Sequence, residues 1–202
     1  PSEREAAMQV FEHITREEGQ KFIGWRTVPV KSEILGKTSG RYEPAIRQIF
    51  IGKNPDITDP MDFERKLYII RRRIEKAVIA AQIAGMYICS LSCRSIIYKG
   101  MMLAEQVAVF YPDLMDDRFE SSFAIYHQRY STNTFPQWKL AQPFRVLAHN
   151  GEINTILGNV NWMKSHEARL EHEHFGRFIE DLKPIVQPGA SDSSALDNVF
   201  EL

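Results

Sequence analysis

Apolar residues near the start of the chain recur every three or four positions. Ala7 or Met8, Phe11 and Ile14 fall on one face of a helix. This spacing predicts an amphipathic helix over residues 3–19, with Gly19 as its stop.

Three later segments also carry helix signals. Residues 101–114 resemble a helix that closes at Pro112, and Ile156, Val160 and Met163 mark one face of a helix after residue 153. Near the end, "GASDSSALD" places Ser and Asp where a helix N-cap belongs, which predicts a final helix.

Other segments alternate or cluster apolar residues as strands do. "KFIGWRTVPV" predicts a strand that Pro29 limits to an edge or a terminus, and "AIRQIFIGKNPD" predicts a second strand ending in turn residues. "MYICSLSCRSIIYKG" is interpreted as one long strand or a hairpin, and "SSFAIYHQRYST" and "PFRVLAHN" are also strand-like. Residues 61–84 fit a strand running into a helix or one long helix, and the former is favoured. The chain is therefore mixed α/β or α+β, with several antiparallel strands.

Composition limits the class of protein. The chain has 202 residues, 44% hydrophobic and 25% charged, which suits one or at most two globular domains. Its 25 basic and 26 acidic residues nearly cancel, which argues against a broad nucleic-acid or membrane-binding surface. The run Arg71-Arg72-Arg73 is followed by Glu75 and is therefore interpreted as a solvated face.

The compartment and the chain ends follow from what the sequence contains. No apolar stretch is long enough for a membrane span and the start resembles no signal peptide, so we expect a cytoplasmic protein. Cys89 and Cys93 are expected to be reduced packing residues. Because the chain begins without Met and stops in an apparent helix, we expect residues 1–202 to form a single partial domain, truncated at both ends.

Three polar clusters raise the question of function. "YHQRYSTNTFPQW" lies at a predicted strand end, and "AHNGEINT" and "GASDSSALD" follow it. Each alone is explained by turn and cap hydrogen bonds. Together they supply an Arg for an α-carboxylate, an Asp for an α-ammonium and an Asn-Gly pair that can polarise a carbonyl. Asn150-Gly151 also fits a type I′ hairpin turn, but the following residues indicate a loop entering a helix.

A long stretch, "HQRYSTNTFPQWKLAQPFRVLAHNGEINTILGNVNWM", closely resembles the class II glutamine amidotransferase domain of glutamate synthase large subunits. "YICSLSCRSIIYKGM" and "FYPDL" resemble the same family in the same order. The resemblance implies an α+β fold of the N-terminal-nucleophile hydrolase type, in which two antiparallel β-sheets are sandwiched between helix layers.

The resemblance also implies roles for individual residues. Arg129 would hold the α-carboxylate of glutamine, with Thr132 and Asn133 completing that wall of the pocket. The side-chain N–H of Asn150 and the backbone N–H of Gly151 would form the oxyanion hole, and Asp192 would bind the α-ammonium. The list of implied site residues is Arg129, Thr132, Asn133, Asn150, Gly151 and Asp192.

The nucleophile implied by the family is a processed N-terminal cysteine whose own α-amino group acts as the base. Residue 1 is Pro, so that cysteine is expected upstream, and nothing in "ICSLSCRS" activates Cys89 or Cys93 in its place. We therefore expect residues 1–202 alone to be inactive. In the parent enzyme, ammonia would pass to a distant synthase site that reductively aminates 2-oxoglutarate.

The expected cofactors and partners follow from the same resemblance. FMN and an iron-sulfur cluster belong to the rest of the parent enzyme, and none is expected in this segment. The implied partners are L-glutamine, the remainder of the large chain and a small subunit, with no nucleic acid and no membrane. Two alternatives stay open, a non-catalytic amino-acid-binding or regulatory module and a structural domain in which the polar residues are only caps.

Several other residues receive structural interpretations. Trp25, Trp138 and Trp162 are expected to be core or loop anchors, because an indole contributes a large buried area. His166, His172 and His174 are interpreted as the charged end of a helix, not as a metal site. The resemblance suggests a structural turn at Lys99-Gly100.

Overall fold

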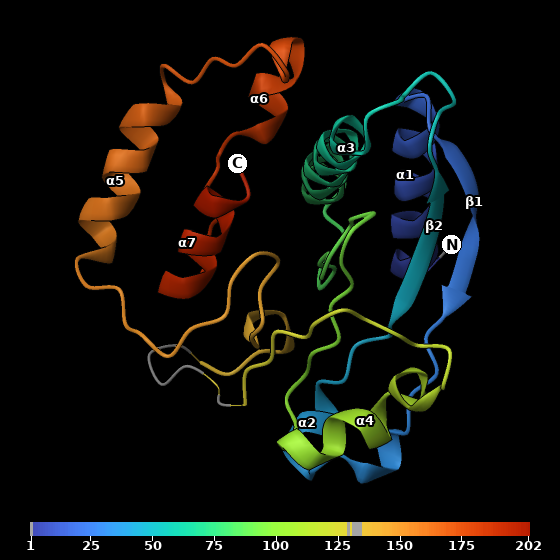
Figure 1. Cartoon of the computed structure of the whole chain (residues 1–202). Coiled ribbons are helices and arrows are strands. Elements are labelled where there is room, and N and C mark those ends of the chain that lie inside the picture. The colour runs from blue at the N-terminus through green and yellow to red at the C-terminus, as the bar shows by residue number, and fades with distance from the viewer. Residues whose placement is uncertain (1, 129, 131–134) are drawn as a thin grey trace. The chain divides into compact units, whose positions relative to one another are not determined.

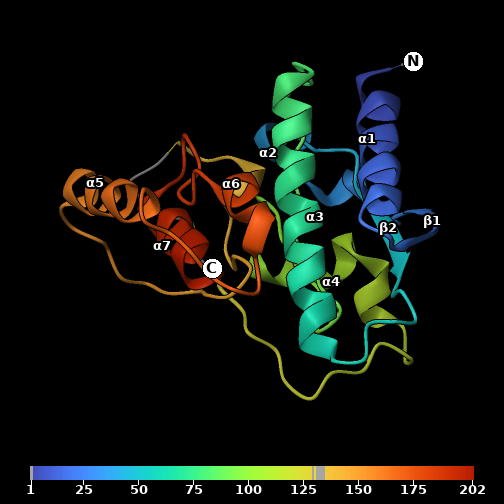
Figure 2. The same ribbon diagram turned by 90° about the horizontal axis from the view of Figure 1, so that it is seen from above.

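A computed structural model describes residues 2–128, 130 and 135–202 and divides the chain into two compact units (Figures 1 and 2). The first comprises the residues up to Arg26, Ile49–Ile96 and His166–Pro184. The second comprises Thr27–Gln48, Ile97–Ser165 and Ile185–Leu202. No helix in the described part of the chain carries an apolar stretch that could cross a bilayer.

The first predicted helix is confirmed as α1 (Glu3–Glu17). Ser2 caps it, because its hydroxyl accepts from the Glu5 amide at 3.3 Å while the Glu5 carboxylate accepts from the Ser2 amide at 2.8 Å. Gly19 adopts a φ of +71°, a left-handed conformation that suits glycine and ends the helix.

Residues 61–84 were expected to run from a strand into a helix, and this is wrong: α3 (Pro60–Ala80) is one long helix. Asp59 caps it by accepting from the Met61 amide at 2.8 Å, and Pro60 occupies the first turn, where its missing N–H costs nothing. Apolar side chains then form one stripe at helical spacing. The buried members of that stripe are Phe63, Leu67, Ile70, Ile74 and Val78.

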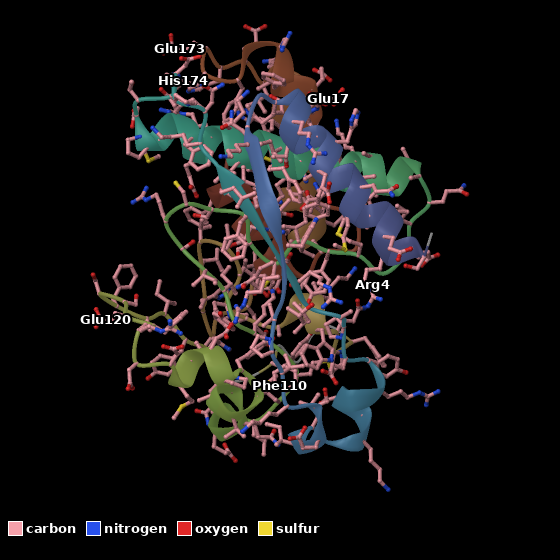
Figure 3. The ribbon with its side chains drawn as sticks, turned by 90° about the vertical axis from the view of Figure 1, so that its right-hand side faces the viewer. Arg4, Glu17, Phe110, Glu120, Glu173 and His174 are labelled. Carbon is pink, nitrogen blue, oxygen red and sulfur yellow. The ribbon has the colours of Figure 1, made fainter. Side chains whose placement is uncertain are left out.

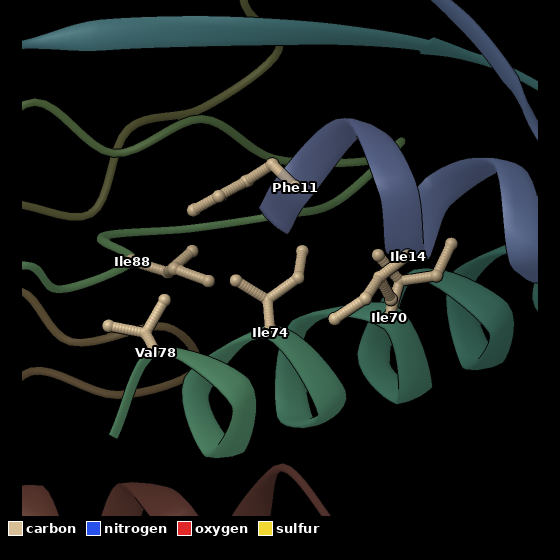
Figure 4. Packing of buried hydrophobic residues seen from close by; sticks show 6 residues of the cluster. All are labelled: Phe11, Ile14, Ile70, Ile74, Val78 and Ile88. Carbon is tan, nitrogen blue, oxygen red and sulfur yellow. The ribbon is translucent and has the colours of Figure 1, made fainter. Parts of the chain in front are cut away.

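The core of the first unit lies between α1 and α3, which run side by side (Figure 4). Phe11 and Ile14 of α1 pack against Ile70 and Ile74 of α3. The edge of the Trp25 ring meets Phe11 with a centroid separation of 5.4 Å. The prediction that Trp25 anchors the core is therefore confirmed.

The arginine run on α3 was expected to be solvated, and for two of its three members this is wrong. Arg71 and Arg72 are only 2% and 3% exposed, and both donate to Glu75, at 2.8 and 2.6 Å. Arg72 also donates to the carbonyl oxygens of Leu182 and Pro184, at 2.9 and 2.7 Å. Arg72 therefore joins α3 to the end of α6 (Ile179–Leu182) and to Pro184. Helix α6 follows a 3-10 turn at Gly176–Phe178.

Two of the predicted strands are confirmed as β1 (Lys21–Thr27) and β2 (Arg47–Gly52), which pair with each other. Their contacts run in opposite directions along the chain, so the pair is antiparallel: a side chain on Gly52 would meet Lys21 and Ile23, while the Val28 amide donates to Ile46. The α+β class is therefore confirmed.

The other predicted strands are not formed in the described residues, where β1 and β2 are the only regular strands. The strand predictions for residues 86–100 and 143–150, and for the described part of 121–132, are therefore wrong here. Side chains satisfy the backbone in place of a neighbouring strand, because Ser92 accepts from the amides of Arg94 and Ser95. The sandwich of two sheets implied by the resemblance is likewise not seen among the described residues.

The second unit is built from short helices around an aromatic core. Its buried centre contains Val28, Phe110, Tyr111 and Trp138, and Phe110 is labelled in Figure 3. The predicted helix at 101–114 is divided at Pro112 and by tighter turns. The elements of this unit include 3-10 turns at Ser32–Ile34, Ala104–Gln106, Pro112–Met115 and Trp138–Leu140, together with α2 (Lys37–Arg41), α4 (Val107–Phe110), most of α5 (Ile156–Glu167) and α7 (Asp192–Phe200).

Two tryptophans of the second unit have opposite environments. Trp138 is 4% exposed and donates from Nε1 to the Ser39 carbonyl at 3.2 Å, so its predicted role as a core anchor is confirmed. Trp162 lies on α5 (Ile156–Glu167), the helix predicted after residue 153, and is 78% exposed. The core prediction for Trp162 is wrong.

Candidate functional site

The loop that carries Asn150-Gly151 is closed by a side-chain amide. Gln142 donates from Nε2 to the His149 carbonyl at 3.0 Å and accepts at Oε1 from the His149 amide at 2.8 Å. Inside this loop the Phe144 amide donates to the Leu147 carbonyl at 2.9 Å. Residues 142–149 therefore form a closed loop with its two ends joined immediately before Asn150.

Helix α7 holds the same loop through two carboxylates. Asp197, which is only 1% exposed, accepts from the amides of Val146 and Leu147 at 2.9 and 3.3 Å. Asp192, in the first turn, accepts from the Ile153 amide at 3.0 Å. These contacts lie on both sides of Asn150-Gly151 in the sequence, so one short helix constrains the backbone before and after the pair.

The start of α7 follows from its sequence. Ser191 is the N-cap, as the Ser and Asp residues there predicted, and its hydroxyl accepts from the Ser194 amide at 3.1 Å. Asp192 comes next, where a negative charge is stabilised by the exposed amides of the first turn. Its Oδ1 accepts from the Ser193 amide at 2.7 Å.

The electrostatics of Asp192 favour its ionised form. Partial burial opposes ionisation, but the hydrogen bonds from Ile153 and Ser193 outweigh it, so the pKa of Asp192 lies below its usual value. An ionised carboxylate that is still partly exposed is suited to bind an ammonium group.

Asn150 and Gly151 are both exposed, and the backbone donor predicted for the oxyanion hole is engaged locally. The Gly151 amide donates to Nδ1 of His149 at 3.0 Å. An accepting Nδ1 carries no proton, so the hydrogen of this ring is assigned to Nε2. An oxyanion that used the Gly151 amide would therefore replace His149 as its acceptor.

The residues after Gly151 agree with a loop that enters a helix. No strand follows the pair, and α5 begins at Ile156. The prediction that this segment is not a hairpin is therefore confirmed.

Three of the predicted binding residues, Arg129, Thr132 and Asn133, lie outside the described residues. Of their described neighbours, Tyr130 uses its hydroxyl to contact the amide and the carbonyl of Gln137, at 2.8 and 3.0 Å. This contact joins Tyr130 to Gln137.

The structure thus brings together two of the three polar clusters found in the sequence, through Asp192 and Ile153. Gln142 and Asp197, which hold the Asn150 loop, were missed as site residues. The only local signal for Gln142 was its place in a motif that resembles the family, and Asp197 lies five residues after Asp192 on the same helix. Neither pattern identifies a backbone partner in advance.

Both cysteines are thiols and not disulfides, as expected, but Cys93 is exposed and lies in a loop. Its thiol lies 3.0 Å from the Glu64 carboxylate. Partial burial, as the larger cause, and the contact with Glu64 together raise the pKa of Cys93 to about 11. A raised pKa lowers the thiolate fraction, and the thiolate is the reactive form. Among the described residues, no group of three or more His, Cys, Asp or Glu side chains is arranged to hold a metal ion.

Residues 1–202 match the family described as class II glutamine amidotransferases over their whole length, and the chain belongs to that family. It is 63% identical, over 91% of its length, to the large chain of glutamate synthase [NADPH] from Azospirillum brasilense, and 45% identical, over 98%, to that from Bacillus subtilis. It is 49% identical, over 97%, to ferredoxin-dependent glutamate synthase 1, chloroplastic/mitochondrial, from Arabidopsis thaliana. The chain spans 12–13% of the length of these relatives.

Proposed function

We propose that this sequence forms the glutamine-binding and oxyanion-stabilising part of the glutaminase site of a glutamate synthase large chain. The observation that carries the proposal is the hydrogen bond from the Ile153 amide to the ionised Asp192. It joins a candidate ammonium-binding carboxylate to the segment that begins with Asn150-Gly151. Membership of the amidotransferase family supports the same assignment.

Each proposed residue has one task in the reaction. Arg129 holds the α-carboxylate of glutamine bidentately, Thr132 and Asn133 complete that wall, and Asp192 binds the α-ammonium. These contacts fix the amino-acid end of the substrate. The side-chain carbonyl is thereby directed toward Asn150 and Gly151.

The chemistry is acyl transfer through a thioester. A cysteine thiolate attacks the γ-carbonyl carbon, and the resulting oxyanion accepts from Asn150 Nδ2 and the Gly151 amide. Collapse of this intermediate breaks the C–N bond and releases ammonia after proton transfer to nitrogen. Water then cleaves the thioester to give glutamate and regenerates the thiol.

We propose that the attacking cysteine is not one of the two within residues 1–202. Cys93 has a raised pKa of about 11 beside Glu64, which is the reverse of an activated thiol. Purified residues 1–202 are therefore expected to release no ammonia from glutamine. Release that survives replacement of Cys89 and Cys93 by serine would show another nucleophile, and release abolished by Cys93→Ser would refute the assignment directly.

The remaining parts of the proposal concern the parent enzyme. Its ammonia passes to a synthase site that holds FMN and an iron-sulfur cluster and reductively aminates 2-oxoglutarate in the cytoplasm. The partners of this segment are the remainder of the large chain and a small subunit. The complete domain is proposed to hold two antiparallel sheets between helix layers, as the family resemblance implies.

Glutamine binding tests the assignment of Asp192. In calorimetric titration, Asp192→Asn is expected to weaken glutamine binding about 10- to 150-fold, since a hydrogen bond between charged groups contributes about 1.5–3 kcal/mol. The matched control is Asp116→Asn, because Asp116 is exposed and contacts Arg118. It should bind glutamine as the wild type does.

A second ligand separates the ammonium contact from a general loss of structure. Glutaramate is glutamine without its α-ammonium, so it should bind the wild type and Asp192→Asn about equally. Arg129→Ala should weaken both ligands, because both keep the carboxylate. If Asp192→Asn weakens glutaramate as much as glutamine, the ammonium assignment is wrong.

A further inference from the structure

The side chain of Gln142 is matched to the backbone directly before the proposed oxyanion hole. Its amide presents a donor and an acceptor side by side, and both are used by one residue, His149. The His149 N–H belongs to the peptide unit that precedes this residue, and the His149 carbonyl belongs to the unit that ends at the nitrogen of Asn150. Gln142 therefore fixes the two consecutive peptide planes that lead into Asn150.

The residues on either side of Gln142-Pro143 in the sequence are buried. These residues, Ala141 and Phe144, are 3% and 7% exposed. The Ala141 amide donates to the Trp138 carbonyl at 3.3 Å, and the Phe144 amide donates to Leu147 at 2.9 Å. The backbone segment that carries the Gln142 side chain is thus packed into the core of its unit.

Asp197 limits the movement of the same loop from its other side. Its carboxylate accepts from Val146 and Leu147, and Arg145 lies 4.0 Å from it. The loop between Gln142 and His149 is therefore anchored at its middle and joined at its ends. The two hydrogen bonds of Gln142 hold the backbone immediately before Asn150.

We propose that Gln142 is a positioning residue that sets the directions of the Asn150 and Gly151 donors. This inference rests on the proposed function. Donors of an oxyanion hole must lie at hydrogen-bond distance from an atom that carries charge only in the transition state. A displacement of about 1 Å at such a site can cost about 100-fold in rate, so loss of this amide lowers the rate more than it lowers substrate affinity.

Only an amide of this length satisfies both partners at neutral pH. In Gln142→Glu the carboxylate can accept from the His149 amide but cannot donate to the His149 carbonyl, and it places a negative charge beside that oxygen. A protonated glutamic acid regains one donor next to one acceptor. Activity of this variant relative to wild type should therefore recover as the pH falls.

The experiment measures glutaminase kcat and KM in the complete natural enzyme that contains this sequence. Gln142→Ala is expected to lower kcat about 10- to 100-fold with KM within about threefold of wild type. Gln142→Glu should lose as much at pH 8 and recover relative to wild type as the pH approaches 5. The control is Gln9→Glu, which adds the same charge at an exposed side chain of α1 and should follow the wild-type pH profile.

The outcomes separate this inference from the function on which it rests. If the wild type does not hydrolyse glutamine, the proposed function fails. If the wild type is active and both Gln142 variants keep its kcat, or change only KM, the positioning role is refuted. If Gln142→Ala does not fold, Gln142→Glu decides: a kcat ratio to wild type that does not change with pH refutes the role, and a ratio that rises with acid supports it.

Discussion

Gly100 is the position where a single added methyl group has the most constrained surroundings. A Cβ on this residue would lie 2.5 Å from the Met102 Cε atom and 2.6 Å from Trp138 Cζ3. Real Cβ contacts are not this short, so something must shift. Met102 ends in a flexible methyl group, whereas Trp138 is 4% exposed and donates to the Ser39 carbonyl.

The magnitude follows from which neighbour can move. The Met102 side chain can rotate away at a small cost, but the indole is fixed by Phe110 and by its own hydrogen bond. Overpacking of a well-filled core costs about 1–3 kcal/mol. The alanine methyl also lowers the entropy of the unfolded chain, which offsets about 0.4–1 kcal/mol, so the expected net loss for Gly100→Ala is about 0–2.6 kcal/mol. Relative to a glycine with open surroundings, which gains the same entropy term, the loss is about 1–3 kcal/mol.

The assay is urea unfolding followed by tryptophan fluorescence and by circular dichroism. Gly24→Ala is the matched control, because a Cβ there meets nothing within 4 Å and its φ is not positive. It should be neutral or slightly stabilising. Gly100→Ala is then combined with Trp138→Phe, which removes the clashing atoms of the indole. In the Trp138→Phe background, Gly100→Ala should cost at least about 1 kcal/mol less than it does in the wild type.

Two results would refute this reasoning. Gly100→Ala as harmless as the Gly24 control would mean that the core absorbs the methyl group. Additive costs in the double variant would mean that the indole does not oppose it. In either case the interpretation of Lys99-Gly100 as a turn that needs glycine for close approach would be wrong.

Three further changes test other parts of the structure. Glu75→Gln removes the carboxylate that two buried guanidinium groups share and should lower the free energy of unfolding by about 3–5 kcal/mol in denaturant titrations. The control is Asp62→Asn, at the exposed pair with Arg65, which should cost less than about 1 kcal/mol. In a Cys89→Ser background, Cys93 should react with iodoacetamide roughly 100-fold more slowly at pH 8 than an ordinary thiol, because its raised pKa leaves little thiolate. Glu64→Gln should speed the reaction. A rate equal to that of an ordinary thiol would contradict the raised pKa. The pKa of Asp192 is lowered in the folded state, so its ionisation stabilises the fold above its unfolded pKa of about 3.9, and this contribution is lost as the pH falls through the folded pKa. The loss of unfolding free energy caused by Asp192→Asn, measured with urea, should therefore shrink from pH 7 to pH 3. A loss that does not change with pH would refute the linkage.

Local sequence signals predicted the elements whose stability depends on local chemistry. Helix α1 has its capping box and its Gly19 stop within the segment itself, and Ser191 lies directly before α7. By contrast, residues 67–70 contain a run of bulky apolar side chains that fits strand or helix equally. The choice depended on packing against α1, which no window of α3 contains.

The burial of the arginine run on α3 was not predicted, for a related reason. A run of arginines is typical of a solvated face, and the burial of Arg72 depends on the distant carbonyl groups of Leu182 and Pro184 as well as on Glu75. The candidate site divides in the same way. The types of side chain that suit glutamine are visible in the sequence, whereas the Gln142 and Asp197 contacts are pairings of side chains with backbone that leave no periodic trace.

The way this loop is held has a bearing on the proposed mechanism. A strand pairs its amides with a neighbouring strand, but the donors of an oxyanion hole have to remain available to the substrate. Here the amides of His149, Val146 and Ile153 donate to the side chains of Gln142, Asp197 and Asp192. The Gly151 amide instead donates to a neutral acceptor, His149 Nδ1.

That exchange of acceptors favours the transition state in the proposed reaction. A carbonyl oxygen of bound glutamine is a neutral acceptor, so replacing His149 with it gains little for the Gly151 amide. The oxyanion is charged, and a hydrogen bond to a charged acceptor is roughly twice as strong as one to a neutral acceptor. The cost of releasing the His149 contact is the same in both states, so the difference between them comes from the stronger bond that the oxyanion accepts. His149→Ala should accordingly tighten glutamine binding and raise kcat/KM by a similar small factor, and a large loss of kcat/KM would assign His149 a direct part in the chemistry.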